Sequence, residues 1–271
     1  MKKGLLTLAL VLVASSSFAH FQMLYTPESA LNTGQKIDLR LTFTHPFADE
    51  HTMEMGLQHD TKTPAAVEEF YVINKDKKKD LLKTLKPITW NGNHNSAGGY
   101  ATTYKARRMG DHMFVLQPAP YYEAGEDIYI QQITKVVINV AGTPTDWDKE
   151  LGLKAEIVPL NKPYSIWTGS TFTGIIKRNG KVVPFADIEV EYINHAPDLT
   201  TNSMGPAFVE APHDSFVTMG IKADANGQFT FGIPKSGWWG FCALGAGSDT
   251  EFKGKELSQD AVIWIQAKDM K

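Results

Sequence analysis

The sequence predicts an all-β protein made of two tandem antiparallel β-sandwich domains that follow a cleaved signal peptide. Residues 37–43 alternate apolar and polar side chains, which is the period of a half-buried strand. Asn179-Gly180 lies between two alternating runs, and Asn-Gly favours a hairpin because both turn positions adopt positive φ. Few stretches have the 3.6-residue period of an amphipathic helix. Together these observations indicate sheets rather than helices.

Further strands are expected in the first half of the chain. They lie at residues 70–73, 112–116, 128–133 and 135–140. Residues 90–100 are rich in Asn and Gly, including Asn91-Gly92-Asn93 and Gly98-Gly99, and this composition predicts a loop.

A composition shift after Ile157-Val158-Pro159 marks the predicted boundary between the two domains. Strands at residues 171–177 and 186–192 flank the Asn-Gly turn, which is the spacing of a small antiparallel sandwich. Residues 194–215 are polar and contain proline, so a long loop is expected there. The predicted organisation is a signal peptide at residues 1–19, an N-terminal sandwich at 20–158 and a C-terminal sandwich at 159–271.

The first residues have the composition of a secretory leader. Lys2 and Lys3 form a basic start, residues 5–14 are apolar, and Ser17 and Ala19 are the small residues that a signal peptidase needs. Cleavage after Ala19 would deliver the mature chain to the periplasm. Elsewhere no apolar run approaches the roughly 20 residues of a membrane helix, so no integral membrane segment is expected in the mature chain.

Charge and cysteine content exclude several classes of function. The chain has 27 basic and 30 acidic residues, and removal of Lys2 and Lys3 leaves 25 against 30, a net charge of −5. A mildly acidic chain without a basic patch is a poor ligand for nucleic acid or for anionic membrane surfaces. Cys242 is the only cysteine, so an intramolecular disulfide and a thiolate metal cluster are excluded.

The first residue of the mature chain would be His20, which offers an α-amine and an imidazole nitrogen to a single metal ion. Both groups lose their proton near neutral pH, so both are available as neutral donors. The strand at residues 37–43 leads to Thr44-His45-Pro46-Phe47, and a short acidic turn then leads to residues 51–59. In an extended chain His51, Met53 and Met55 would share one face. The predicted metal ligands are His20, His45, His51, Met53, Met55 and His59.

Donor type limits which metals are expected. Imidazole suits nickel, cobalt, copper and zinc, whereas thioether favours softer ions such as Cu(I). Each histidine also has an ordinary structural explanation as a strand end, a core residue or a solvated side chain. His112 reaches the same site only if its strand lies beside the first one, and His94, His195 and His213 are weaker candidates. Nucleophile-elbow, phosphate-loop and zinc-protease motifs are absent from the sequence, so no enzymatic activity is predicted.

These residues also carry a resemblance. The chain resembles exported bacterial proteins of a family long called a domain of unknown function, whose members are described as periplasmic components of cobalt or nickel uptake systems. The resemblance implies an Ig-like or prealbumin-like fold, with a prealbumin-like second domain. It also implies a nickel- or cobalt-handling role for His20, His45 and His51, with an inner-membrane metal transporter as partner. It lies in residues 19–23, 44–47, 51–55, 120–123, 126–129, 235–241 and 260–264.

Two alternatives remain open. An N-terminal histidine on a β-sandwich is also similar to the histidine brace of lytic polysaccharide monooxygenases and to the copper site of periplasmic copper-resistance proteins. Because divalent affinities favour Cu²⁺ at most nitrogen sites, ligand type alone leaves a copper-binding protein or a copper-dependent oxidase possible. The other alternative is an adhesion or scaffold sandwich whose histidines have no special role.

Overall fold

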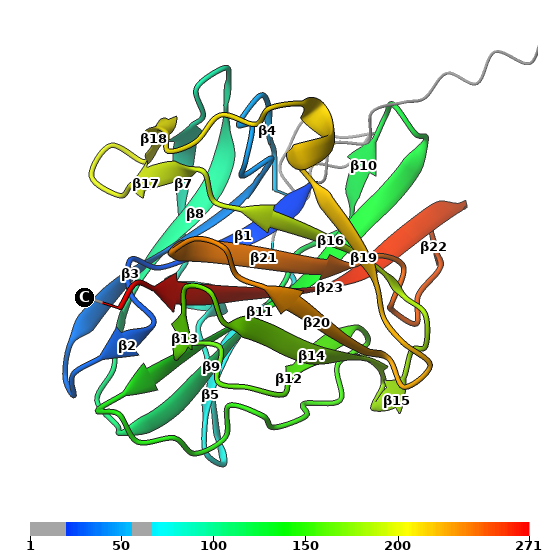
Figure 1. Cartoon of the computed structure of the whole chain (residues 1–271). Coiled ribbons are helices and arrows are strands. Elements are labelled where there is room, and N and C mark those ends of the chain that lie inside the picture. The colour runs from blue at the N-terminus through cyan, green and yellow to red at the C-terminus, as the bar shows by residue number, and fades with distance from the viewer. Residues whose placement is uncertain (1–19, 56–66, 271) are drawn as a thin grey trace, which may run out of the picture.

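The protein is described here from a computed structural model, which describes residues 20–55 and 67–270. These residues form β-strands and two short 3-10 helices, so the predicted all-β sandwich class is confirmed (Figure 1). Among these residues no helix is long and apolar enough to span a membrane. The strands build three sheets, which we call the first, central and third sheets.

The first sheet has seven strands, and β1 and β3 lead the chain to the candidate site. Its strands in spatial order are β1 (Phe21–Tyr25), β3 (Lys36–Thr44), β8 (Ser96–Lys105), β7 (Lys86–Asn91), β18 (Ser203–Ala207) and β17 (His195–Asp198), with β4 (Thr52–Met53) paired to β3.

The central sheet has twelve strands and runs through the middle of the molecule. Its main path is β19 (Met219–Lys222), β16 (Asp187–Tyr192), β21 (Gly237–Ala243), β23 (Lys255–Lys268), β11 (Ile128–Val140), β9 (Gly110–Gln117), β5 (Glu69–Asn74) and β6 (Lys77–Asp80). The short strands β2 (Ala30–Leu31), β10 (Tyr121–Glu123), β13 (Ile166–Trp167) and β22 (Glu251–Phe252) pair with β11 or β23.

The third sheet has four strands and covers the opposite face of the central sheet. It consists of β12 (Glu156–Pro159), β14 (Thr171–Arg178), β15 (Lys181–Val182) and β20 (Gln228–Gly232). The 3-10 helices are η1 (Leu82–Thr84) and η2 (Asp214–Phe216).

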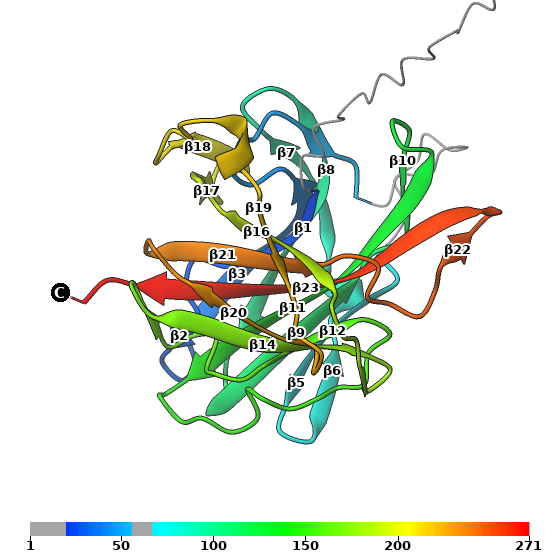
Figure 2. The ribbon, with the colours of Figure 1, turned by 45° about the vertical axis from the view of Figure 1, so that its right-hand side comes forward.

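Side chains on the long central strands alternate between two hydrophobic cores. On β23, Val262 and Trp264 pack in the core shared with the first sheet, whereas Ile263 and Ile265 pack in the core shared with the third sheet. Figure 2 shows β14 and β20 of the third sheet below β21 and β23. The result is a three-layered molecule whose central strands are buried on both faces.

The middle of the central sheet is a parallel pair. β11 and β23 run in the same direction from Tyr129 opposite Leu257 to Val136 opposite Trp264. The sequence predicted antiparallel sheets, and this pair departs from that prediction because its partners lie about 130 residues apart and leave no local signal.

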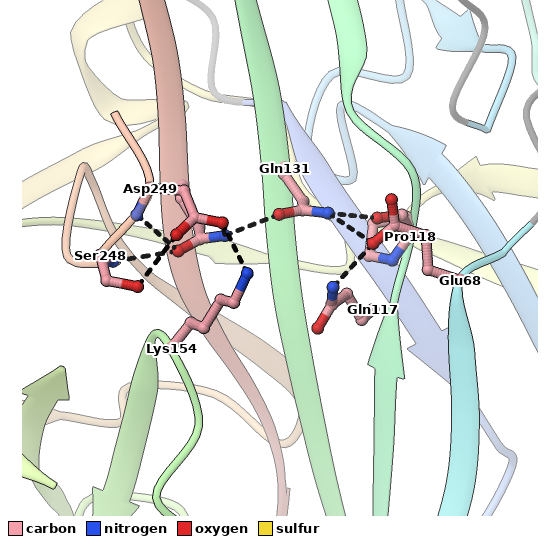
Figure 3. A network of polar contacts seen from close by, with 8 residues as sticks. Glu68, Gln117, Pro118, Gln131, Lys154, Ser248 and Asp249 are labelled. Atoms are coloured by element: carbon pink, nitrogen blue, oxygen red, sulfur yellow. Dashed lines mark hydrogen bonds and ion pairs between the residues drawn. The ribbon is translucent and has the colours of Figure 1, made fainter. Parts of the chain in front are cut away.

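A ladder of glutamines ties the parallel pair together at its polar end. Gln259 on β23 donates to Gln131 on β11 over 2.7 Å, and Gln131 donates to the Pro118 carbonyl over 2.8 Å. Figure 3 shows this network extending to Glu68 on one side and to Asp249 on the other. Each buried amide therefore has partners, which removes the cost of burying it.

Strands from both sides of residue 158 contribute to the first and central sheets. The predicted domain boundary at 158/159 itself stays a prediction. The strand predictions at residues 37–43, 171–177 and 186–192 are confirmed by β3, β14 and β16.

Two predicted loops are wrong. Residues 90–100 lie in β7, β8 and a tight turn between them, and the glycines serve close packing rather than a loop. A Cβ on Gly99 would lie 2.7 Å from the Leu41 carbonyl oxygen of the neighbouring strand. Residues 194–215 hold β17, β18 and part of η2, and β18 extends the first sheet by pairing with β7.

One glycine of the central sheet gives a stability prediction. A Cβ on Gly240 would lie 2.7 Å from the ring of Trp264, so Gly240→Ala is expected to destabilise the fold by about 1–3 kcal/mol through overpacking. Urea unfolding measures the change. Gly220→Ala, on a strand where a Cβ meets nothing within 4 Å, is the matched control and is expected to leave stability nearly unchanged. Equal unfolding midpoints for the two variants would contradict the packing argument.

Candidate metal centre

His20 lies immediately before β1 and is held in place through its backbone. Gln132 on β11 donates to the His20 carbonyl over 2.7 Å, and the backbone N–H of Gln22, two residues on, donates to the Gln132 side-chain oxygen over 2.7 Å. Because Gln132 is itself buried in the central sheet, the backbone at His20 is fixed rather than trailing in solvent.

The His20 ring is oriented by a carboxylate. Its Nε2 lies 3.0 Å from Oε2 of Glu123 on β10. Burial, together with the nearby charge of His45, lowers the pKa of His20 to about 4, although Glu123 acts in the opposite direction. The ring is therefore neutral at pH 7, with its proton on Nε2 facing Glu123 and its lone pair on Nδ1.

His45 is oriented in the complementary way. It follows β3, and its Nδ1 forms a short hydrogen bond to Glu50 in the turn that leads to β4. Burial acts to raise the pKa of Glu50, but the hydrogen bond and the charge of His45 outweigh it, so this pKa is lowered. When the proton of neutral His45 lies on Nδ1, its lone pair lies on Nε2.

The two rings lie against each other. The His20 and His45 centroids are 4.7 Å apart at an angle of 85°, and Phe43 and Tyr121 flank the His20 ring. Antiparallel pairing explains this proximity, because Phe21 is opposite Thr44 and so the residues next to each of them meet at one end of the strands. The structure thus brings together two of the six residues predicted from the sequence as ligands, His20 and His45.

His51 lies at the rim of this site. Its side chain is exposed, its carbonyl accepts from the His45 backbone N–H over 3.3 Å, and its charge lowers the pKa of His20. Met53 and Met55 are instead buried in the core between the first and central sheets, and the Met55 sulfur accepts from Gln22 over 3.5 Å. His59 lies outside the described residues.

The remaining histidines of the described residues are held by other partners. Both nitrogens of His112 are engaged, by the Tyr104 hydroxyl at 2.9 Å and the Arg108 carbonyl at 3.0 Å, at the opposite end of the central sheet. His195 bonds to the Gly205 carbonyl, and His213 caps η2. His94 bonds to the Asp49 carbonyl.

Within residues 20–55 and 67–270, no group of three or more His, Cys, Asp or Glu side chains is arranged to hold a metal ion. His20 and His45 supply two imidazole donors. The cleavage after Ala19 that the sequence predicts would turn the main-chain nitrogen of His20 into an amine and a third donor. It closes a six-membered ring with the metal only through Nδ1, which is the nitrogen that Glu123 leaves with a lone pair.

Carboxylates surround this end of the molecule. Glu191 on β16 is fully buried, accepts from the Phe47 backbone N–H over 3.2 Å and bonds to Thr218. Burial raises the pKa of Glu191 well above its usual value, and the charges of Glu189 and Glu50 raise it further. Glu191 therefore fixes the turn that follows His45.

Glu189 gives a prediction for stability against pH. Burial, with the charges of Asp260 and Glu126, raises its pKa from 4.5 to about 7. Between these values the folded protein holds a proton that the unfolded chain releases, so stability falls as pH rises across this window. Glu189→Gln is expected to stabilise the protein by at most about 3 kcal/mol at pH 8 and to have little effect at pH 4.

Urea unfolding at pH 4, 6 and 8 measures this effect. Exposed Asp187 lies on the same strand, and Asp187→Asn is the control that should lack the pH-dependent gain. A gain for Glu189→Gln that is constant across the three pH values would refute the assignment.

The residues that the sequence analysis missed are those that orient the histidines. Glu50 and Glu123 hold the two rings, and Gln132 holds the His20 carbonyl. Glu123 lies within the run 120–123 that carried the family resemblance, which was the available signal. Gln132 is distant in sequence from His20 and becomes adjacent only through sheet packing.

Comparison with known proteins places the chain in a family. The sequence profile of the family described as Domain of unknown function (DUF4198) matches residues 17–247. The chain belongs to this family. The DUF4198 match begins just before His20 and includes His45 and His51, together with both orienting carboxylates. No curated protein matches the chain.

Solved structures give distant likenesses only. The D0-D1 domain of intimin is 11% identical with a TM-score of 0.21, covering 89% of this chain and 96% of that one. The adhesin InvE of Yersinia pseudotuberculosis is 14% identical with a TM-score of 0.23, covering 89% of this chain and 58% of that one. Alpha-2-macroglobulin of Salmonella, reacted with methylamine, is 9% identical with a TM-score of 0.23, covering 90% of this chain and 14% of that one. At these values none of them bears on the function of this chain.

Proposed function

We propose that this DUF4198 protein is a periplasmic transition-metal-binding protein that captures nickel or cobalt for an inner-membrane uptake transporter, without chemical turnover. The metal is its cargo. The ligands are the amine and Nδ1 of His20 and the Nε2 of His45, with His51 at the rim. The transporter as partner rests on the family resemblance described above.

The observation that carries this proposal is the pairing of two imidazoles that are each hydrogen-bonded to a carboxylate. Glu123 meets Nε2 of His20, Glu50 meets Nδ1 of His45, and the rings are 4.7 Å apart. Metal-binding histidines commonly donate their other ring N–H to a carboxylate, which fixes the tautomer and raises the basicity of the ligand. Two rings with this arrangement side by side are more than core packing requires.

Electrostatics supports cation capture at the same place. Glu123 and Glu50 each contact one of the two rings, and the pKa of Glu50 is lowered, which favours its charged form. Negative charge beside a binding site raises the local concentration of cations.

Copper is the second candidate, as a bound ion or as the centre of an oxidase. Three nitrogen donors, one amine and two imidazoles, form the donor set of a histidine brace, and the divalent affinity order favours Cu²⁺ at such a site. The same observation therefore supports a copper-binding protein, and only measured affinities separate the two.

The test is competitive titration of Ni²⁺, Co²⁺ and Cu²⁺ into protein that begins at His20. We expect one tight site per chain, lost in His45→Ala and kept in His112→Gln, because His112 lies at the Val140 end of β11, opposite the end that carries Glu123. Equal affinity in His45→Ala and the parent protein would refute the proposal. If only copper binds tightly, and the reduced protein consumes oxygen in the presence of a polysaccharide, the nickel or cobalt uptake proposal is wrong and the copper-dependent oxidase takes its place.

Glu123 gives a graded prediction for the same site. Glu123→Gln keeps a group that can bond to His20 but removes the negative charge, so metal affinity is expected to fall by about 10–100-fold. Exposed Glu251 is the matched control, and Glu251→Gln is expected to change nothing. Isothermal titration with the preferred metal measures both. An unchanged affinity in Glu123→Gln would show that its hydrogen bond to His20 does not tune the ligand.

A further inference from the structure

No basic patch is expected from the sequence. Basic side chains from three segments that are far apart in the chain gather at one end of the molecule. All of them are exposed: Lys36, Lys77, Lys79, Lys105, Arg107 and Arg108. We call this set the basic end. Their separation in sequence, and the excess of acidic residues elsewhere, hid the cluster.

Direct contacts connect the three segments. Lys36 on β3 is directly opposite Lys105 on β8. The Lys79 ammonium lies 5.6 Å from the ring of Tyr104, which is the neighbour of Lys105 on β8. The Tyr104 hydroxyl meets His112, and His112 meets the Arg108 carbonyl. The six cations therefore surround one small region.

Acidic residues offset this charge only in part. Asp38, Asp76 and Asp80 are nearby exposed carboxylates, and Asp38 bonds to Thr103. Asp111 points to the other side of β9, where it accepts the backbone N–H groups of residues 145–147. Six cations against three exposed carboxylates leave a local net charge of about +3.

Two features of the basic end bear on what it contacts. Like charges directly opposite each other in a sheet, as Lys36 and Lys105 are, destabilise the pairing. Met109 follows the two arginines with 55% of its surface exposed. An exposed apolar side chain therefore lies directly beside the cations.

This end is opposite the candidate metal centre. β3 runs from Lys36 to the residue before His45, which is about 27 Å at a rise of 3.4 Å per residue. β11 pairs with Glu123 at its Ile128 end and with Gly110 at its Val140 end. Figure 2 shows β10 toward the top, and β5 and β6 at the bottom. The molecule is therefore polarised, with carboxylates around the histidines and cations at the far end.

We propose that the basic end binds the surface of an anionic phospholipid membrane, with Met109 entering the headgroup region. Clustered Lys and Arg side chains are attracted to anionic lipid, and an adjacent apolar side chain adds burial in the interface. The carboxylates at the other end are repelled by the same surface. The bound molecule therefore presents its histidines away from the membrane to which it is attached.

The observations favour a lipid surface over other anionic partners. The cations come from an edge strand, a turn and a strand start, so they form a dispersed set around an exposed apolar tip. The apolar side chain of Met109 makes no hydrogen bond or ion pair with a phosphate backbone, whereas its transfer from water into a bilayer interface is favourable. This inference is independent of whether the histidines bind a metal.

The test is co-sedimentation of metal-free protein with vesicles of pure phosphatidylcholine or with 30% phosphatidylglycerol. We expect binding to the anionic vesicles only, weakened by salt. A triple variant of the basic end is expected to partition onto the anionic vesicles about a hundredfold less than the parent protein: Lys79→Gln/Arg107→Gln/Arg108→Gln. Lys154→Gln/Lys181→Gln/Lys222→Gln removes the same charge elsewhere and should bind like the parent protein. Equal losses in both variants, or equal binding to both kinds of vesicle, would overturn the proposal.

A fluorescent label tests the orientation without removing any charge from the basic end. Cys242 is buried, so a polarity-sensitive probe can be attached selectively at Met109→Cys or at Glu126→Cys. Anionic vesicles are expected to shift the emission of the probe at 109 to shorter wavelength and to leave the probe at 126 unchanged. A shift for the probe at 126 alone would show that the other end of the molecule contacts the membrane, which would overturn the proposal. Binding to heparin without any shift at 109 on vesicles would assign this end to an anionic polymer instead.

Discussion

One alanine added before His20 is expected to lower the affinity for the preferred metal by about a hundredfold or more. The added residue turns the His20 amine into an amide, which is a poor donor at neutral pH, and the chelate ring with Nδ1 is lost. Altering a group that merely orients a ligand lowers metal affinity by about 10–100-fold. Loss of a ligand itself is therefore expected to lower the affinity further. The rest of the site, including Glu123 and Glu50, is left as it is.

Competitive titration of the two proteins measures the loss, with mass spectrometry to verify each N-terminus. The control is the same extension on His45→Ala, where the site is already broken and the extra residue should cost far less. Unfolding of the metal-free proteins should be identical, because His20 is held through its carbonyl and the amine has no structural role. If the extension leaves affinity unchanged, the amine is not a ligand.

Removal of one partner of the Lys135–Glu156 pair is expected to destabilise the fold by about 3–5 kcal/mol. The ammonium and the carboxylate lie 2.7 Å apart, and each residue is 2% exposed. Glu156 also accepts the backbone N–H groups of Leu151, Gly152 and Leu153. Lys135→Met leaves a buried carboxylate without its counter-charge.

The double variant Lys135→Met/Glu156→Gln is expected to recover much of this loss. Its neutral amide needs no counter-charge, and its oxygen still accepts from the 151–153 backbone. Urea unfolding at pH 7 of the two single variants and the double variant gives the coupling energy directly. Additive losses would show that the two side chains do not stabilise each other. Exposed Lys154–Asp249 is the control pair, for which a coupling below about 1 kcal/mol is expected.

The same pair explains a limit of sequence-based prediction. The sequence analysis ended one strand at 133 and began another at 135, yet β11 is continuous from Ile128 to Val140. A lysine within an apolar run is expected at a strand end, and its burial becomes acceptable only when Glu156 is placed beside it. Local patterns were sufficient where each strand had one polar face, as in residues 37–43 and 171–177.

The candidate site, too, could be predicted only in part: local patterns pointed to some residues, and contacts made only in the folded chain determine the others. His20 and His45 could be proposed as neighbours from their residue types, and antiparallel pairing of β1 with β3 brings them together. The extended-face argument for His51, Met53 and Met55 did not include the packing of β4 on β3, which buries the methionines. Glu50 and Gln132 act through hydrogen bonds that only the folded chain forms. The basic end was missed for the same reason.

The position of β23 also determines when the protein can fold. This strand comes from the last part of the chain, yet it separates β11 from β21 and bonds to both. Until residues 255–268 have been made, those two long strands have no partner on their facing edges, and the two cores lack their shared wall. Pairing across so many residues is slow to form. Residues 255–268 must therefore be present before the central sheet closes.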